Sequence, residues 1–344
     1  MNKLENAVIK YAIDLEKYKN GQAREIVSLL DKANNEMARF IRETKSVSTK
    51  ARYKEITKKL NEVSQALKEN VDEHTDIDGL IDYELSKTKK LLGLIPKKAD
   101  EIPFTYPSRE QIKTAALFQP ITTDGYGMTY QSYLEGIRTG LFNTWDSAVR
   151  TGYLTGEPTQ KIVRNVLGSP RKDGQLINAG TMQSLKNSVY ANTRTALQSF
   201  ANETMQRVYK ANDELFGDIA PDGKMYKYEY LATLDSRTCL VCADSAKLYK
   251  EFSDIPHVPQ HRGCRCIVLP YFNIEGDTRS SKDGYIKADI SFDEWLREQD
   301  TKTQKEILGA TRYKMFINDN KPISTFVDNG EILTLEQLKE RGEL

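Results

Sequence analysis

Histidine and cysteine are scarce in this sequence of 344 residues, which contains three histidines and four cysteines. Histidine is the most frequent general base in enzymes, and no acid pair or activated nucleophile stands out in the chain. One dense group of acids with an imidazole is present, and a solvated turn between helices explains it better than a divalent-cation loop. This group consists of Asp72, Glu73, His74, Asp76 and Asp78. The composition therefore favours a protein that is not an enzyme.

The chain also lacks an excess of either charge. It has 50 Lys and Arg against 49 Asp and Glu, which gives a formal net charge of +1. A protein that coats DNA is usually strongly basic. Any contact with nucleic acid would therefore need a local basic patch.

Long apolar runs are absent as well. No stretch approaches the roughly 20 apolar residues that span a bilayer, and the segment that begins Met1-Asn2-Lys3 lacks the apolar run of a signal peptide. We therefore expect no membrane segment and synthesis in the cytoplasm. Hydrophobic residues still make up 39% of the chain, which is enough to form compact cores.

The first hundred residues contain apolar side chains at alternating spacings of three and four. This spacing predicts amphipathic helices, and the mixed charges between the apolar positions are typical of a helical hairpin or short coiled coil. The pattern is interrupted near Gly21 and then resumes. We predict an N-terminal helical hairpin or coiled region over 1–100 that packs within this chain, with docking of a partner helix as the alternative.

Prolines break this pattern after residue 95 and predict a linker over 96–125, with a turn at 122–127. Helical spacing returns from Tyr130 and again over 185–208, and Pro158 suits an early helix position. The sequence thus predicts a linker and helical core over 101–225. Alternating residues at 225–231 and an apolar run at 267–271 predict two strands of a small β module over 226–275. A short helical tail is expected over 276–344, and the overall fold class is α+β, mainly α-helical.

All four cysteines lie within 28 residues, together with two of the three histidines. In a reducing compartment such clustering favours a metal site over disulfides. Cys239 and Cys242 form a Cys-x-x-Cys pair, and a His-x-x-Cys-x-Cys segment begins nineteen residues later. Structural zinc takes four thiolate or imidazole ligands, often from two short pairs joined by a loop. We predict a structural zinc site formed by Cys239, Cys242, His261 and one or both of Cys264 and Cys266.

Several alternatives remain open for this site. An all-cysteine site with a hydrogen-bonded His261 behind it also fits the spacing, and His257 is a weaker candidate because it lies between two prolines. Two disulfides or four free buried thiols are further interpretations. A catalytic zinc is disfavoured because thiolate-rich sites are usually closed and structural.

Arginines lie close to both cysteine pairs. Arg237 precedes the first pair, and Arg262 and Arg265 lie within the second segment. They are candidate contacts to DNA or to an acidic partner. Local ion pairs that support the metal site are the simpler interpretation.

The order of residues around the cysteines resembles the phage head morphogenesis family, the minor head proteins of tailed phages such as Mu. Its pattern is roughly T-x-D-x-R-T-C-x-x-C, then a turn with an aromatic residue, then P-x-H-x-x-C-R-C. Residues Thr233 to Cys242, Tyr249 and Pro259 to Cys266 fill every fixed position. Segments 189–195 and 291–312 also look like parts of this family. The resemblance covers roughly 125–320 and is specific at 231–266.

The resemblance implies a minor capsid protein present in few copies at the portal vertex inside the phage head. Its partners would be the phage portal protein and the capsid or scaffold interior, with non-specific DNA as a further candidate. It would act in head assembly or genome delivery, and it would be found in the virion and, during assembly, in the host cytoplasm. A phage-delivered enzyme, such as a nuclease or toxin-like effector, and a DNA-binding module are the alternatives.

Overall fold

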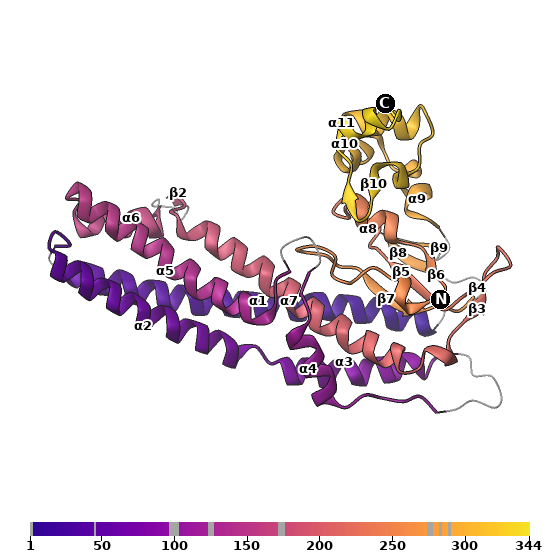
Figure 1. Ribbon diagram of the computed structural model, residues 1–344, viewed down its shortest axis with the longest axis horizontal. Helices are drawn as coiled ribbons and strands as arrows, with labels where there is room; N and C mark the ends of the chain where they lie inside the picture. The colour runs from indigo at the N-terminus through magenta and orange to yellow at the C-terminus, as the bar shows by residue number, and fades with distance from the viewer. Residues whose placement is uncertain are drawn as a thin grey trace.

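The computed structural model describes residues 3–44, 46–95, 103–122, 127–170, 176–273, 278–281, 284–287 and 290–344. It confirms an α+β fold that is mainly α-helical. Long helices lie side by side in an elongated body, while the strands from β3 onward and the C-terminal helices gather at one end (Figure 1). Among the described residues, no helix is both long and apolar enough to cross a membrane.

Three long helices form the N-terminal part: α1 (Lys3–Glu43), α2 (Lys50–His74) and α3 (Ile77–Leu92). The expected helical pattern is confirmed, but α1 continues without a break through Gly21. The Thr49 side chain accepts a hydrogen bond from the backbone of Arg52 at the start of α2. Asp76 caps α3 in the same way by accepting from Gly79. These caps satisfy backbone donors that the first helical turn leaves unpaired.

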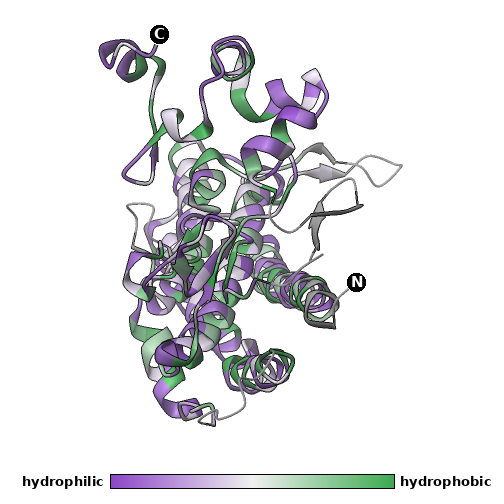
Figure 2. Ribbon diagram, turned by 90° about the vertical axis from the view of Figure 1, so that its right-hand side faces the viewer, coloured by the Kyte–Doolittle hydropathy of each residue, from purple (hydrophilic) through white to green (hydrophobic). Residues whose placement is uncertain are grey.

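Three further helices complete the body: α5 (Tyr130–Thr155), α6 (Thr159–Leu167) and α7 (Met182–Lys210). Helix α2 packs against α5, and α7 packs against α1 and α3. Hydrophilic and hydrophobic residues are interspersed along the helices (Figure 2), as amphipathic helices require. Trp145 of α5 is fully buried, and its indole donates a 2.7 Å hydrogen bond to Asn34 of α1. Pro158 is the N-cap residue just before α6.

The expected linker over 96–125 contains one more helix, α4 (Arg109–Phe118). The linker prediction is wrong there because Ser108 and Gln111 form a reciprocal capping box that starts a helix between the prolines. Ile112 and Ala116 bury its inner side. Residues 96–102 and 123–126, which include most of the expected turn, lie outside the described residues.

The predicted strands are present in a three-stranded antiparallel sheet of order β6-β5-β7. Its strands are β5 (Tyr228–Leu231), β6 (Leu248–Tyr249) and β7 (Ile267–Pro270). Tyr230 lies opposite Val268 in the central register, and both are buried. Four hairpins are also described: β1 (Ser169–Pro170) with β2 (Leu176–Asn178), β3 (Asp218–Ile219) with β4 (Met225–Tyr226), β8 (Thr278–Ser281) with β9 (Gly284–Lys287), and β10 (Val327–Asp328) with β11 (Glu331–Ile332).

The C-terminal tail contains α9 (Phe292–Glu298), α10 (Thr301–Ile317) and α11 (Leu335–Glu340). Gly309 interrupts α10 with a φ of 71°, a conformation that glycine adopts without steric cost. Three short 3-10 helices, η1 (Asp213–Leu215), η2 (Phe252–Asp254) and η3 (Ile323–Phe326), complete the described elements together with α8 (Leu240–Ser245). The expected helical tail is thus present, with the β8–β9 hairpin before its first helix and the β10–β11 hairpin between α10 and α11.

Two hydrophobic cores organise the described residues. The first extends from Tyr11 to Val268, so the long helices and the three-stranded sheet share it. The second joins Leu234, Leu240 and Ala243 to apolar side chains of the tail between Phe292 and Leu338. Apolar packing is therefore continuous across the boundaries that the sequence suggests near residues 100 and 225. The four-part division of the chain stays a prediction about folding units.

Candidate metal centre

The first cysteine pair lies at the start of α8. Cys239 is the N-cap residue of this helix, and its sulfur accepts a hydrogen bond from the backbone of Cys242 at 3.4 Å. The cap position and the third helical position bring both sulfurs to the same end of the helix. The Cys-x-x-Cys spacing therefore forms a two-sulfur pair through helix capping.

The second segment, His261 to Cys266, is a turn followed by extended chain. The backbone N–H of Cys264 donates to the carbonyl of His261 at 3.1 Å. Gly263 has a φ of +78° in this turn, a conformation that favours glycine. Cys264 and Cys266 lie in the extended chain directly before β7 rather than inside it. Both thiols nevertheless lie close to Cys242.

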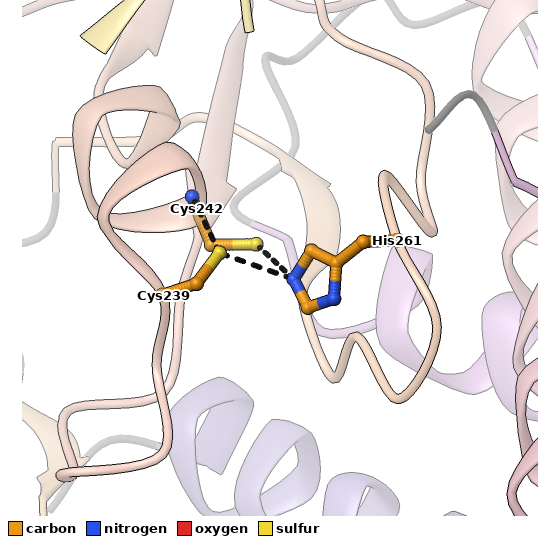
Figure 3. A group of neighbouring side chains, drawn as sticks. All are labelled: Cys239, Cys242 and His261. Atoms are coloured by element: carbon orange, nitrogen blue, oxygen red, sulfur yellow. Dashed lines mark hydrogen bonds between the residues drawn. The ribbon is translucent and has the colours of Figure 1, made fainter. Parts of the chain in front are cut away.

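The two segments converge at Cys242. His261 Nε2 lies 3.2 Å from the sulfur of Cys239 and 3.2 Å from the sulfur of Cys242 (Figure 3). The sulfur of Cys242 also lies 3.8 Å from that of Cys264. Cys239, Cys242 and His261 form one group of donor atoms within 4.8 Å, and Cys242, Cys264 and Cys266 form a second. All five predicted donors are thus brought together, and Cys242 belongs to both groups.

The separation of the Cys242 and Cys264 sulfurs suits a shared metal ion. Sulfur atoms at the corners of a tetrahedron with metal–sulfur bonds of about 2.3 Å are separated by roughly 3.8 Å. The observed separation of Cys242 and Cys264 equals this value. All four cysteines are free, and this sulfur–sulfur distance is far beyond the roughly 2.05 Å of a disulfide bond. The arrangement could hold a metal ion, and it contains none of the disulfides that the sequence left open.

Hydrogen bonds behind the donors fix their orientation. The Nδ1 atom of His261 lies 2.9 Å from the carbonyl oxygen of Arg262. This contact aims Nε2 at the thiols, as the second nitrogen of a metal-binding histidine commonly requires. The Tyr230 hydroxyl donates to the sulfur of Cys242 at 3.9 Å, and Gln260 donates to that hydroxyl at 2.8 Å. The sheet and the loop thus hold the donors from one side.

Helix α7 holds the second segment from the other side. The backbone N–H of Gly263 donates to the hydroxyl of Thr195 at 2.9 Å, and Asn202 donates to the carbonyl of Cys266 at 3.3 Å. The sequence alone does not identify Thr195, Asn202 or Tyr230 as supports of the donor residues. Polar residues at 195, 198 and 202 on the buried side of a helix were the available signal, but that signal does not specify which loop they contact.

The thiols influence one another strongly. Hydrogen bonding from Cys242 and the nearby His261 lower the pKa of Cys239 to about 4, whereas contact with the three other thiols raises the pKa of Cys242. Hydrogen bonds from Cys242 and Cys266 lower the pKa of Cys264. The contact with Cys239 raises the pKa of His261 to about 9. Crowded thiolates repel one another, so full ionisation of this cluster requires a cation at its centre.

The three arginines have different environments. Arg265 makes two hydrogen bonds with the carboxylate of Asp235, at 2.6 and 2.7 Å, and both side chains are largely buried. Arg262 lies 3.3 Å from the carbonyl oxygen of Asn187 on α7. The side chain of Arg237 is 77% exposed. Arg265 and Arg262 therefore bind within the chain. Arg237 also lies 3.6 Å from the carboxylate of Asp235, but its largely exposed side chain remains a candidate external contact.

The other residues considered from the sequence lie apart from the cluster. His257 is not a member of either donor group, and burial lowers its pKa. In the acidic group, Asp72 accepts a hydrogen bond from Tyr130, Asp76 caps α3, and Asp78 pairs with Lys113 at 2.8 Å. These contacts are structural, as expected for a turn between helices.

Comparisons with known protein families, with curated proteins and with solved structures find no match for this chain.

Proposed function

We propose that this chain is a minor head protein of a tailed bacteriophage, associated with the portal, in which the cysteine and histidine cluster binds structural zinc. The main support is that the two cysteine-containing segments of the pattern that resembles this family lie together in the structure. The Cys-x-x-Cys pair and the His-x-x-Cys-x-Cys segment are separated by eighteen residues, yet their side chains meet within hydrogen-bonding distance.

The donor chemistry supports zinc. Thiolate and imidazole groups are the ligands of tetrahedral structural zinc sites. Cys242, Cys264 and Cys266 are each at most 3% exposed, which fits a closed site more than a catalytic site with an open position. Cys239, Cys242, Cys264 and His261 would hold the ion, and Cys266 is the alternative fourth thiolate. When bound, the ion would crosslink α8 to the loop before β7.

The elongated helical body supports the structural role. Helices α1, α2, α5 and α7 form a long body (Figure 1) and contain side chains of both charges, which suits contacts with the portal protein and the capsid or scaffold interior. Arg237 offers a site for non-specific DNA contact because its side chain is exposed. In this proposal the protein acts in head assembly or genome delivery and has no catalytic role.

Quantitative mass spectrometry of purified phage particles tests this function. The chain should be present at a fixed ratio below that of the portal protein, and an abundant host cytoplasmic protein in the same sample controls for contamination. Absence from the particles would overturn the virion role. A transient assembly factor, a nuclease or toxin-like effector, or a DNA-binding module would then need testing.

Elemental analysis tests the metal separately. Protein purified under reducing conditions without added metal should contain close to one zinc per chain. Cys239→Ser should lose that zinc, whereas Ser253→Ala, an exposed change in η2 outside the donor groups, should retain it. Another metal in the wild-type protein, or full zinc in Cys239→Ser, would contradict the assignment.

A further inference from the structure

We propose that α8 couples metal binding to the docking of the C-terminal tail, residues 290–344, so that loss of the metal releases the tail from the body. This inference rests on the proposed zinc site. It adds a conformational change, release of the tail, to the structural role proposed for the metal.

Helix α8 belongs to both hydrophobic cores. Cys242 is a member of the first core, with the helical body and the sheet. Leu240 and Ala243, on the same short helix, are members of the second core. One face of α8 therefore contacts the body and the metal ligands, while another contacts the tail.

The tail packs around this helix. Helix α8 contacts η3, α9, β10 and β11, which are four separate elements of the tail. Leu234, in the loop before Cys239, adds a third apolar side chain from outside the tail to the second core. Within the tail, Phe316, Phe326 and Leu338 are fully buried in this same core. Docking of the tail thus depends on the position of α8 and its preceding loop.

The position of α8 depends in turn on the metal ligands. The helix has six residues, and helices this short are not stable by themselves in water. Its N-cap residue is Cys239, and its buried anchor to the body is Cys242. A metal bound to both sulfurs would fix the start of the helix to the loop at His261. Without the metal, this crosslink between α8 and the loop at His261 would be lost.

The tail has little stability of its own to offset this loss. A hydrophobic core within fewer than about 80 residues leaves only a small margin of stability. Removing Leu234, Leu240 and Ala243 from the second core would expose its apolar interior to water. We therefore expect the tail to dissociate from the body and lose its packing when the metal is removed, while the long helices stay folded.

Hydrogen–deuterium exchange of the full-length protein tests this coupling. Under reducing conditions, a zinc chelator should increase exchange at least about tenfold in α8 and in 290–344, because these amides would exchange from a released state. Peptides from α2 and α5 should keep their protection. Re-addition of zinc should restore slow exchange in the tail.

Two variants separate docking from metal binding. Leu240→Asp places a charge in the second core without changing a ligand, so it should keep one zinc per chain and show fast exchange in the tail. Val241→Asp makes the same charge change at the neighbouring, half-buried position, which belongs to neither core, and should keep both zinc and a protected tail.

The outcomes distinguish this inference from the metal assignment. A wild-type protein that binds zinc but keeps the same tail exchange after its removal would overturn the coupling alone. A protein without any bound metal would overturn the zinc assignment and the coupling together. A tail that stays protected from exchange in Leu240→Asp would also overturn the coupling, because docking of the tail would then not depend on α8.

Discussion

The helical body and the cysteine–histidine region are stabilised in different ways. In the body, many apolar side chains distributed over α1, α2, α3, α5 and α7 contribute to one core. In the region of α8 and β7, elements of four to six residues add only a few side chains to the cores, and the metal donors with their hydrogen bonds join these elements. Stability is therefore distributed in the first region and concentrated in the second. A single substitution should lower the stability of the body only partly. In the metal region, the segment from β5 to β7 with the donor residues, loss of one donor should cause unfolding.

The largest expected effect is that of Cys242→Ser, because Cys242 belongs to both donor groups. Structural zinc contributes roughly 10–16 kcal/mol of apparent binding free energy in zinc-finger peptides. We expect loss of bound zinc and unfolding of the segment from β5 to β7, while α2 and α5 stay folded. Elemental analysis and limited proteolysis with peptide mapping measure both results.

Cys266→Ser is the matched comparison, because Cys266 belongs to one donor group only. It should retain more zinc than Cys242→Ser. Equal zinc content in the two variants would contradict the central position of Cys242.

In the body, Trp145→Ala should cause a large but graded loss. Trp145 is fully buried, and its indole donates a hydrogen bond to Asn34. Truncation of a buried aromatic side chain costs about 3–5 kcal/mol, and Asn34 would lose its partner. Denaturant unfolding followed by circular dichroism should show this decrease with zinc still bound in the native state. Arg150→Ala, on an exposed part of the same helix, should change stability by less than about 0.5 kcal/mol.

The stability of the helical body should depend on pH through Glu84. It is fully buried in α3 and accepts a hydrogen bond from the Tyr11 hydroxyl of α1. Burial raises the pKa of Glu84 from 4.5 to about 8. The folded state therefore binds a proton that the unfolded state has lost, and stability should fall by about 1.4 kcal/mol per unit as the pH rises from 4.5 to about 8.

Glu84→Gln should remove this part of the pH dependence, because the amide stays neutral throughout. Unfolding free energies measured at several pH values test the slope. Glu62→Gln, at an exposed position of α2, should leave the slope unchanged. The same slope in Glu84→Gln and in the wild-type protein would show that Glu84 is already ionised in the fold.

The contrast between the two regions also explains what the sequence could predict. Periodic apolar residues such as Leu60, Val63 and Leu67 predicted a helix correctly because a buried helical face repeats its pattern over many residues. The interruption expected near Gly21 did not occur, because a single glycine costs only about 1 kcal/mol in a helix that packs against α2 and α7. Helix α4 was missed because the surrounding prolines dominated the local pattern.

The donor residues were predictable for a different reason. Their spacing is a property of the chain, and Cys239 and Cys242 are brought together by one turn of helix. Their supports were not predictable in this way. Thr195 and Asn202 reach the loop at Gly263 and Cys266 only through the packing of α7, across more than sixty residues of sequence. Local spacing carries no information about such contacts.

The smallest expected effects are those of two arginine substitutions, one at Arg265, which pairs with Asp235, and one at the exposed Arg237. Arg265→Ala should destabilise the metal region by roughly 1–3 kcal/mol, because it removes two charge-assisted hydrogen bonds and leaves the largely buried Asp235 without its main partner. Burial alone would raise the pKa of Asp235, but Arg265 more than offsets this and lowers it. The stabilising contribution is therefore present above the usual carboxyl pKa and is lost as the pH falls.

Arg237→Ala should leave stability within about 0.5 kcal/mol of the wild type, because its side chain is 77% exposed. If Arg237 contacts DNA, this variant should instead weaken retention on a DNA column and reduce its salt dependence by about one phosphate contact. Thermal unfolding and salt-gradient elution of both arginine variants measure the two effects separately. A stability loss in Arg237→Ala equal to that in Arg265→Ala would show that both arginines support the metal region from within the chain.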